Sequence, residues 1–165
     1  MSTKTATVRL ANDRMQFEAT MGSGHTIVLD DGADDTGARP AELMGAALGA
    51  CTAMDVISIL RKKRQAIRHY EVRVSALQGE HHPHAFSRFD VVHVIDGDGI
   101  DPEAVRRAIE LSVTKYCSVG STLSSGAVEI HHAYLIREAN GDERYAEVMA
   151  AGPNIAPEAL AAGGA

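Results

Sequence analysis

Residues 42–64 read ELMGAALGACTAMDVISILRKKR, and this stretch decides the fold. Nearly every residue at 43–60 is apolar or small, and the run is too long and too irregular in its alternation for a strand. Pro40 suits a first helical position, and the basic cluster at 61–64 suits a last turn, where positive charge is favourable. The stretch therefore predicts a helix of about six turns. Because it is apolar nearly all round, we expect it to be buried, with Cys51 near its middle.

Two other interpretations of this helix compete with a functional one. A membrane-spanning helix needs roughly 20 apolar residues, but the uncharged part between Glu42 and Asp55 has only 12. We therefore expect no membrane span. Cys51 could also be an inert core thiol, because free cysteine is among the most buried residue types. A chemical role for Cys51 needs a second feature elsewhere in the chain.

Composition limits the class of protein. A chain of 165 residues with 45% hydrophobic content suits one globular domain. The net charge of -6 and the scattered basic residues argue against a nucleic-acid partner or an anionic membrane surface. The opening residues MSTKTATVRL contain no apolar run, so we expect no secretory signal and a cytoplasmic location. Two cysteines are too few for a disulfide framework and indicate redox chemistry, a metal or no function at all.

The order of elements indicates an α+β fold, with strands before the helix and more strands and helices after it. Apart from the long helix, the expected elements are strands at 5–10, 15–20 and 25–30, an acidic loop with solvated carboxylates at 30–39, strands at 69–76 and 86–95, a helix from Asp101 to Cys117, a short helix at 118–123 and a strand at 128–136. We assign residues 1–137 to one domain. Residues 138–165 turn polar and then rich in Ala, Gly and Pro, and we expect this tail to be ordered only in part.

The histidines do not form a convincing metal site in the sequence. His81, His82 and His84 lie together in a predicted turn, but a ligand set needs convergence from more than one segment. His131 and His132 are neighbours on a strand and point to opposite faces, so they cannot share one ion from within that strand. We therefore predict no metal and no cofactor.

Each of the two main helices carries one cysteine, Cys51 in the middle of one and Cys117 at the end of the other. Two helices packed on one face of a sheet can bring these thiols together, and a disulfide is possible if the Cα atoms come within about 7 Å. Cys117, at the start of a short helix, has backbone N–H groups nearby that would stabilise a thiolate. Cys51 has no such help and needs a cation close by.

Residues 39–56 (RPAELMGAALGACTAMDV) and 115–123 (KYCSVGSTL), in that order and separated by a strand pair, resemble the OsmC/Ohr family of osmotically induced and organic-hydroperoxide-resistance proteins. The resemblance extends over about residues 5–137. It implies an OsmC-like fold, with an antiparallel sheet and two main helices, and an intertwined homodimer with active sites between subunits. It also implies that Cys51 attacks a peroxide and becomes a sulfenic acid, that Cys117 resolves it as a disulfide, and that a dithiol reductant reopens the bond.

This chain departs from the active peroxidases of that family at the start of the central helix. Those enzymes carry a Glu directly after the Pro, and this Glu orients a catalytic Arg. Here Ala41 follows Pro40, and Glu42 comes one residue later, a rotation of about 100° around the helix. Where many members have a Pro after the second cysteine, this chain has Ser118. The pattern indicates a divergent branch of the family.

The group that would activate Cys51 is not local. The family's catalytic Arg lies in the N-terminal strands, where Arg9 and Arg14 are the candidates. Arg39 precedes Cys51 by about 18 Å along a helix, too far for its side chain to reach the thiol within one subunit. Asp55, one turn after Cys51, would raise the pKa of a thiol that it faced. We expect Asp55 instead to form a salt bridge or to contact a helix terminus.

Three functions follow from these observations. The first is an enzyme, a thiol-dependent reductase of organic hydroperoxides or hydrogen peroxide, with Cys51 and Cys117 as its catalytic pair and Arg9, Arg14, Arg39 and Glu42 as candidate supporting residues. The second is a non-catalytic protein of the same fold that binds a small apolar ligand in the dimer crevice. The third is a Cys/His metal site. Loss of both free thiols on exposure to peroxide would favour the enzyme, and retained thiols with a bound apolar molecule would favour the binding protein.

Overall fold

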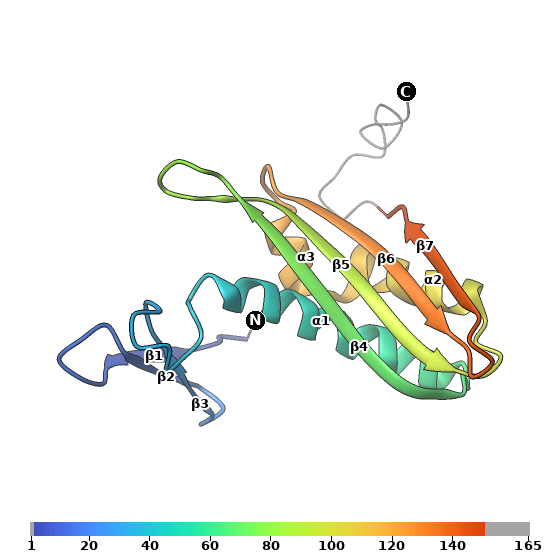
Figure 1. Cartoon of the computed structure of the whole chain (residues 1–165), viewed down its shortest axis with the longest axis horizontal. Coiled ribbons are helices and arrows are strands. Elements are labelled where there is room, and N and C mark those ends of the chain that lie inside the picture. Colours follow the sequence, from blue (N-terminus) through green and yellow to red (C-terminus); the bar gives the residue numbers. More distant parts are fainter. Residues whose placement is uncertain (1, 151–165) are drawn as a thin grey trace. The chain divides into compact units, whose positions relative to one another are not determined.

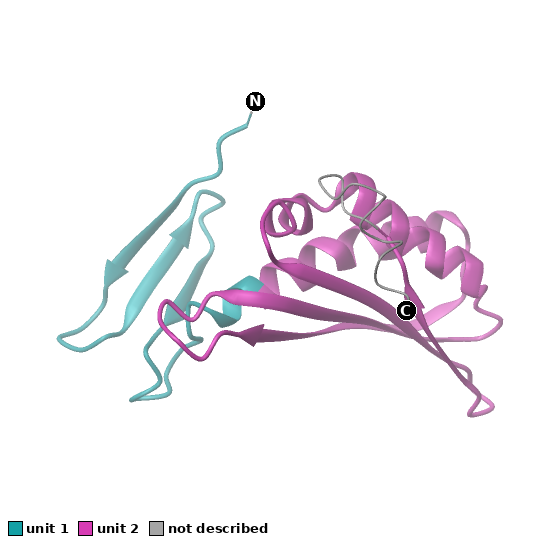
Figure 2. Cartoon of the chain, turned by 90° about the horizontal axis from the view of Figure 1, so that it is seen from above, with its two compact units in different colours: residues 1–44 teal, residues 45–165 magenta. Residues whose placement is uncertain are grey.

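The computed structural model describes residues 2–150, and the chain divides into two compact units, Met1–Met44 and Gly45–Ala165 (Figure 2). The first unit contains a three-stranded antiparallel sheet in the order β1-β2-β3, formed by Ala6–Leu10, Phe17–Met21 and Thr26–Leu29 (Figure 1). All three predicted strands are confirmed. Each begins one or two residues later than the composition indicated.

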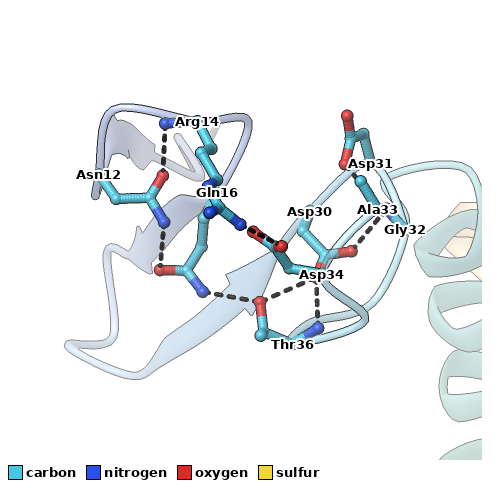
Figure 3. A network of polar contacts seen from close by, with 9 residues as sticks. All are labelled: Asn12, Arg14, Gln16, Asp30, Asp31, Gly32, Ala33, Asp34 and Thr36. Carbon is cyan, nitrogen blue, oxygen red and sulfur yellow. Dashed lines mark hydrogen bonds and ion pairs between the residues drawn. The ribbon is translucent and has the colours of Figure 1, made fainter.

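Asp30 organises the loop that follows β3. Its carboxylate is buried and accepts hydrogen bonds from the backbone N–H groups of Gly32 and Thr36 at 2.9 and 2.5 Å (Figure 3). The Gly37 N–H donates to the same carboxylate at 2.8 Å. Burial alone would raise the pKa of Asp30, but these bonds and the Thr36 hydroxyl outweigh it and hold the pKa below its usual range. The expectation that the carboxylates of this loop are all solvated is therefore wrong for Asp30. Its carboxylate instead accepts hydrogen bonds from N–H groups of the loop backbone.

The second unit is a mixed four-stranded sheet with helices on one face (Figure 2). Its strands lie in the order β4-β5-β6-β7 and comprise Ile67–Gln78, Phe86–Gly97, Glu129–Arg137 and Glu143–Val148. The β4–β5 and β6–β7 pairs are antiparallel, whereas β5 and β6 are parallel. A parallel pair needs a crossover, which here consists of α2 (Pro102–Leu111), a π-helical turn (Ser112–Tyr116) and α3 (Ser118–Leu123). The predicted antiparallel sheet thus contains one parallel pair.

The long helix α1 (Glu42–Lys62) has only one buried stripe. Leu48, Thr52, Val56 and Leu60 recur every four residues and are fully buried, whereas Met54 is 71% exposed. The prediction that the helix is buried all round is wrong for the single chain, because a helix lying on a sheet is covered on one side only. By length and composition α1 could cross a membrane, but the core helix of a soluble protein passes the same test.

The core of the second unit has two parts, and α1 contributes to both. In the larger part, Val56 and Leu60 of α1 pack with residues from the sheet and α2: Ile95, Ile100, Ala104, Val105, Ala108, Ile109, Tyr134, Ile136 and Val148. In the smaller part, Leu48 packs with Phe89, Val91 and Cys117, and the half-buried Cys51 lies against this cluster. Packing of α1 and the crossover on one sheet face therefore brings both cysteines into one apolar region.

The strand β7 lies in the segment predicted as a tail. Residues 143–148 pair with β6 along their whole length, and Val148 is buried in the core. No strand was predicted here, because the apolar cluster of Tyr145, Val148 and Met149 is short and no periodic apolar stripe extends beyond it. The division of the chain into a domain at 1–137 and a tail at 138–165 stays a prediction, and residues 151–165 lie outside the described part of the chain.

Candidate active site

Cys51 on α1 and Cys117 at the start of α3 lie close together. The two Sγ atoms and a carboxylate oxygen of Asp55 all lie within 4.8 Å of one another. Both thiols are free. The structure thus brings together the two cysteines that the sequence singled out, although they belong to different helices.

The π-helical turn before Cys117 determines where its sulfur points. The Cys117 backbone N–H donates to the Ser112 carbonyl at 2.8 Å, and Cys117 is then extended, with φ -72° and ψ 98°. It caps α3, and the Gly120 N–H donates to its Sγ at 3.2 Å. A Cβ at position 120 would lie 3.3 Å from that sulfur, so glycine allows the close approach.

The two thiols differ in exposure. Cys51 is half-buried, whereas Cys117 is only 4% exposed. Burial raises the pKa of Cys117 to about 12, and the neighbouring Cys51 and Asp55 act in the same direction, against the lowering effect of the Gly120 N–H. The predicted N–H contact to Cys117 is present, but burial outweighs it and keeps this thiol protonated.

Asp55 faces the two thiols and is held by hydroxyl groups. The Ser112 hydroxyl donates its only proton to Asp55 Oδ2 at 2.9 Å. In the 3.0 Å contact between Ser112 and Thr52, the Thr52 hydroxyl is therefore the donor. Within residues 45–150, Asp55 forms no ion pair. Of the two contacts expected for Asp55, the salt bridge is absent within residues 45–150, whereas the contact with a helix terminus is present, because Ser112 is the C-cap residue of α2.

Two buried histidines lie on the helix-covered face of the sheet. The Tyr70 hydroxyl contacts His93 Nδ1 at 2.8 Å, and the His93 and His132 rings stack with centroids 5.9 Å apart. Within the described residues, His93 Nε2 and His132 Nδ1 have no hydrogen-bond partner. Burial lowers the pKa of His93 to about 3 and that of His132 to about 4, so both rings are neutral at physiological pH.

A small cavity of about 30 Å³ borders both Cys117 and His132. One water needs roughly 10–15 Å³, so this space suits one or two water molecules and no larger ligand. Sequence analysis did not assign a role to His93 or His132. The period-two alternation of their strands was the available signal, since it places both on the inner face, and the exposure of the adjacent His131 confirms the predicted opposite orientation of the 131–132 pair.

The candidate arginines Arg9 and Arg14 belong to the first unit. Arg9 is exposed on β1 and lies opposite Glu18 of β2. Arg14 forms an ion pair with Asp34 (Figure 3). The structure shows these local partners, and a role for either arginine at the thiols stays a prediction.

Arg39 and Glu42 are both engaged at the start of α1. The Arg39 guanidinium pairs with Asp35 at 2.8 Å, and its backbone N–H donates to Glu42 Oε2 at 2.9 Å. Glu42 therefore caps the N-terminus of its own helix, as the Glu of a capping box does when it accepts from the N-cap N–H three residues earlier. Their supporting roles at the thiols likewise stay predictions.

Comparison with known proteins identifies the fold and the family. Residues 32–133 match the model of the family described as OsmC-like protein. The YhfA protein of Escherichia coli K12 is 37% identical over 120 residues, which cover 73% of this chain and 89% of YhfA.

Two solved structures show the same fold at lower identity. An OsmC-like protein from Mycoplasma pneumoniae superposes with a TM-score of 0.68 at 15% identity, covering 81% of this chain and 95% of that one. The organic hydroperoxide resistance protein OhrB of Bacillus subtilis superposes with a TM-score of 0.54 at 19% identity, covering 81% and 98%. The family match, the identity to YhfA and the fold agree, and this chain belongs to the OsmC-like protein family.

Proposed function

We propose that this protein is a thiol-dependent peroxidase that reduces organic hydroperoxides or hydrogen peroxide as part of peroxide stress defence. The observation that carries the proposal is the approach of two free thiols, Cys51 and Cys117, whose sulfur atoms lie within 4.8 Å in an apolar region of the second unit. Family membership and the fold shared with an organic hydroperoxide resistance protein support it.

The difference in exposure supports Cys51 as the thiol that attacks the peroxide and Cys117 as the one that resolves the sulfenic acid. Cys51 is half-buried and can be reached from solvent, so the peroxide meets it first, whereas Cys117 is almost fully buried behind it. The apolar surroundings of Cys51 favour an organic peroxide over water. A thiolate is the reactive form, and the raised pKa of Cys117 makes that residue the poorer initial nucleophile.

The reaction proceeds in three balanced steps. The Cys51 thiolate attacks the distal peroxide oxygen, the O–O bond breaks, and the alkoxide takes a proton and leaves as an alcohol, with Cys51 now a sulfenic acid. Cys117 then attacks that sulfur, its proton goes to the departing hydroxide, and water and a disulfide form. A dithiol reductant supplies two electrons and two protons to restore both thiols. The sulfurs must close to about 2.05 Å in the disulfide, a short movement from their present separation.

The test is the intact mass and free-thiol content of the reduced protein before and after one equivalent of cumene hydroperoxide. In the parent protein we expect loss of both thiols and a mass lower by two hydrogen atoms. In Cys117→Ser we expect Cys51 to gain one or more oxygen atoms, since it has no resolving partner. In Cys51→Ser we expect Cys117 to stay largely unmodified.

Unmodified thiols in the parent and in both variants, under excess peroxide, would refute the peroxidase. If the parent then retained an apolar molecule through purification, the non-catalytic binding function would take its place. A mass increase at Cys117 in Cys51→Ser, with Cys51 unreactive in Cys117→Ser, would instead reverse the two roles.

A further inference from the structure

Cys51, Asp55 and Cys117 form a convergent set of metal-binding side chains in the second unit. Cys51 and Asp55 are four residues apart on α1 and so lie on one face of the helix. Cys117 reaches the same place from the crossover, and the three potential ligand atoms lie within 4.8 Å of one another. Ligands from two elements that meet at one point distinguish this cluster from the histidines of the 81–84 turn.

The electrostatics of the cluster indicate a missing positive charge. Cys51, Asp55 and Cys117 all become negative on losing a proton, and their potential ligand atoms lie within 4.8 Å of one another. Within residues 45–150, Asp55 accepts a hydrogen bond from the Ser112 hydroxyl and forms no ion pair. A half-buried carboxylate beside two thiols is stabilised by a bound cation.

From this arrangement we propose that the reduced protein binds one divalent transition-metal ion of the zinc class through Cys51 Sγ, Cys117 Sγ and an Asp55 oxygen. Two thiolates exclude Mg²⁺ and Ca²⁺, which prefer oxygen ligands, and favour Zn²⁺. Three protein ligands leave a fourth tetrahedral position for water.

The neighbouring groups suit such a site. Ser112, backed by Thr52, fixes the Asp55 carboxylate, and Gly120 N–H donates to Cys117 Sγ. Hydrogen bonds of this kind, from neighbouring groups to the side chains that bind the metal, orient those side chains. Binding converts two thiols to thiolates and releases two protons to solvent, with no oxidant required. A Cys51–Cys117 disulfide would use both sulfurs, so the site exists only in the reduced form.

The experiment titrates the fully reduced protein with Co²⁺ without oxygen, in the presence of a phosphine reductant, and then displaces Co²⁺ with Zn²⁺. We expect one Co²⁺ per chain, a thiolate-to-cobalt charge-transfer band in the near ultraviolet, and release of about two protons per ion. Cys117→Ser should reduce the band by roughly half, because one of the two thiolates is lost. Asp55→Asn, which keeps both thiols, should weaken binding at least tenfold, about the loss that follows removal of a supporting metal contact.

Asp13→Asn is the matched control, because it removes the same charge from an exposed residue of the first unit and should leave affinity unchanged. Two titratable free thiols per chain with no charge-transfer band would overturn the proposal, and so would equal affinity in the parent and in a folded Asp55→Asn variant. Proton release by the parent tests the site without any variant. None of these measurements uses peroxide, so failure of the peroxidase and failure of the metal site give separate results.

Discussion

At the residue scale, the buried histidines His93 and His132 tie stability to pH. Both are neutral in the folded protein, with pKa values lowered to about 3 and about 4, whereas an unfolded histidine titrates near 6.5. Below about pH 6.5 the unfolded chain therefore binds protons that the folded chain does not, which favours unfolding. Their contribution to stability is complete above pH 6.5 and is lost as the pH falls toward 4.

We predict that the free energy of unfolding falls below pH 6.5 by up to about 1.4 kcal/mol per pH unit for each buried histidine. Denaturant unfolding at a series of pH values measures this slope. His132→Gln should make the slope shallower by about one proton, while His81→Gln, at an exposed position away from both buried histidines, should leave it unchanged. Parallel slopes for the parent and His132→Gln between pH 6.5 and 4 would contradict the prediction.

Two glycines of α1 show how little space separates the helix from β4. A Cβ at position 45 would lie 3.6 Å from the nearest Val74 atom, an ordinary contact, but at position 49 it would lie 3.0 Å from Val74 Cγ2. Alanine is the better helix former by about 1 kcal/mol. At position 49, that gain is set against an overpacking cost of about 1–3 kcal/mol, because the β-branched Val74 side chain is stiff.

We predict opposite effects of the same substitution at these two positions. Gly45→Ala should raise the free energy of unfolding by about 0.5–1 kcal/mol, and Gly49→Ala should lower it by about 1 kcal/mol. Thermal and denaturant unfolding of both variants provide the comparison. If both variants were stabilised, α1 would have room to move away from the sheet.

At the scale of elements, the strand β7 forms one edge of the sheet and adds a side chain to its core. Val148 packs in the larger core cluster, and the whole strand pairs with β6. We predict that truncation after Arg137 lowers the melting temperature markedly, because it removes a core side chain and leaves β6 as an unpaired edge. Truncation after Ala150, which keeps every strand of the sheet, is the reference. Equal melting temperatures of the two truncated proteins would show that β7 adds nothing to stability.

The elements themselves could be predicted from sequence where the local signal was strong. The apolar run of α1 and the Asp101-Pro102-Glu103 helix start both gave the correct helices, because capping and periodicity act within a few residues. The parallel β5–β6 pair was missed, although the helices predicted between these two strands form the kind of crossover that joins parallel neighbours. The half-exposed α1 was missed because composition shows which residues are apolar but not which of them the same chain covers.

The site was predictable in part for the same reason. The cysteines stood out as the only two in the chain, and the resemblance paired them. The Ser112–Asp55 contact depends on the π-helical turn, which shifts the crossover backbone by one residue and has no signature in the sequence. The buried histidines are set by the tertiary packing of three strands, which alternation within one strand suggests but does not establish.

At the scale of the whole molecule, the uncovered side of α1 predicts a homodimer. Met54 is 71% exposed on a helix that is otherwise apolar, and a second subunit would remove that surface from water. We predict that the parent sediments as a dimer at micromolar concentration. Met54→Glu should weaken the dimer at least about tenfold by placing a charge in the interface.

Met149→Glu is the control, because Met149 has the same 71% exposure but lies outside α1. It should sediment as the parent does. A folded parent that sediments as a monomer would exclude the dimer, and a stable Met54→Glu dimer would place the interface elsewhere on the chain.

The parallel pairing of β5 with β6 also affects how the chain folds while it is being synthesised. Contacts across a crossover have high contact order, so they form slowly and only after the later partner strand has been made. Cys117 lies on that crossover, and its place beside Cys51 depends on β6 having docked. A nascent chain that has not yet exposed residues 129–137 would therefore hold Cys51 as an unpaired thiol, open to over-oxidation and to disulfides with other chains.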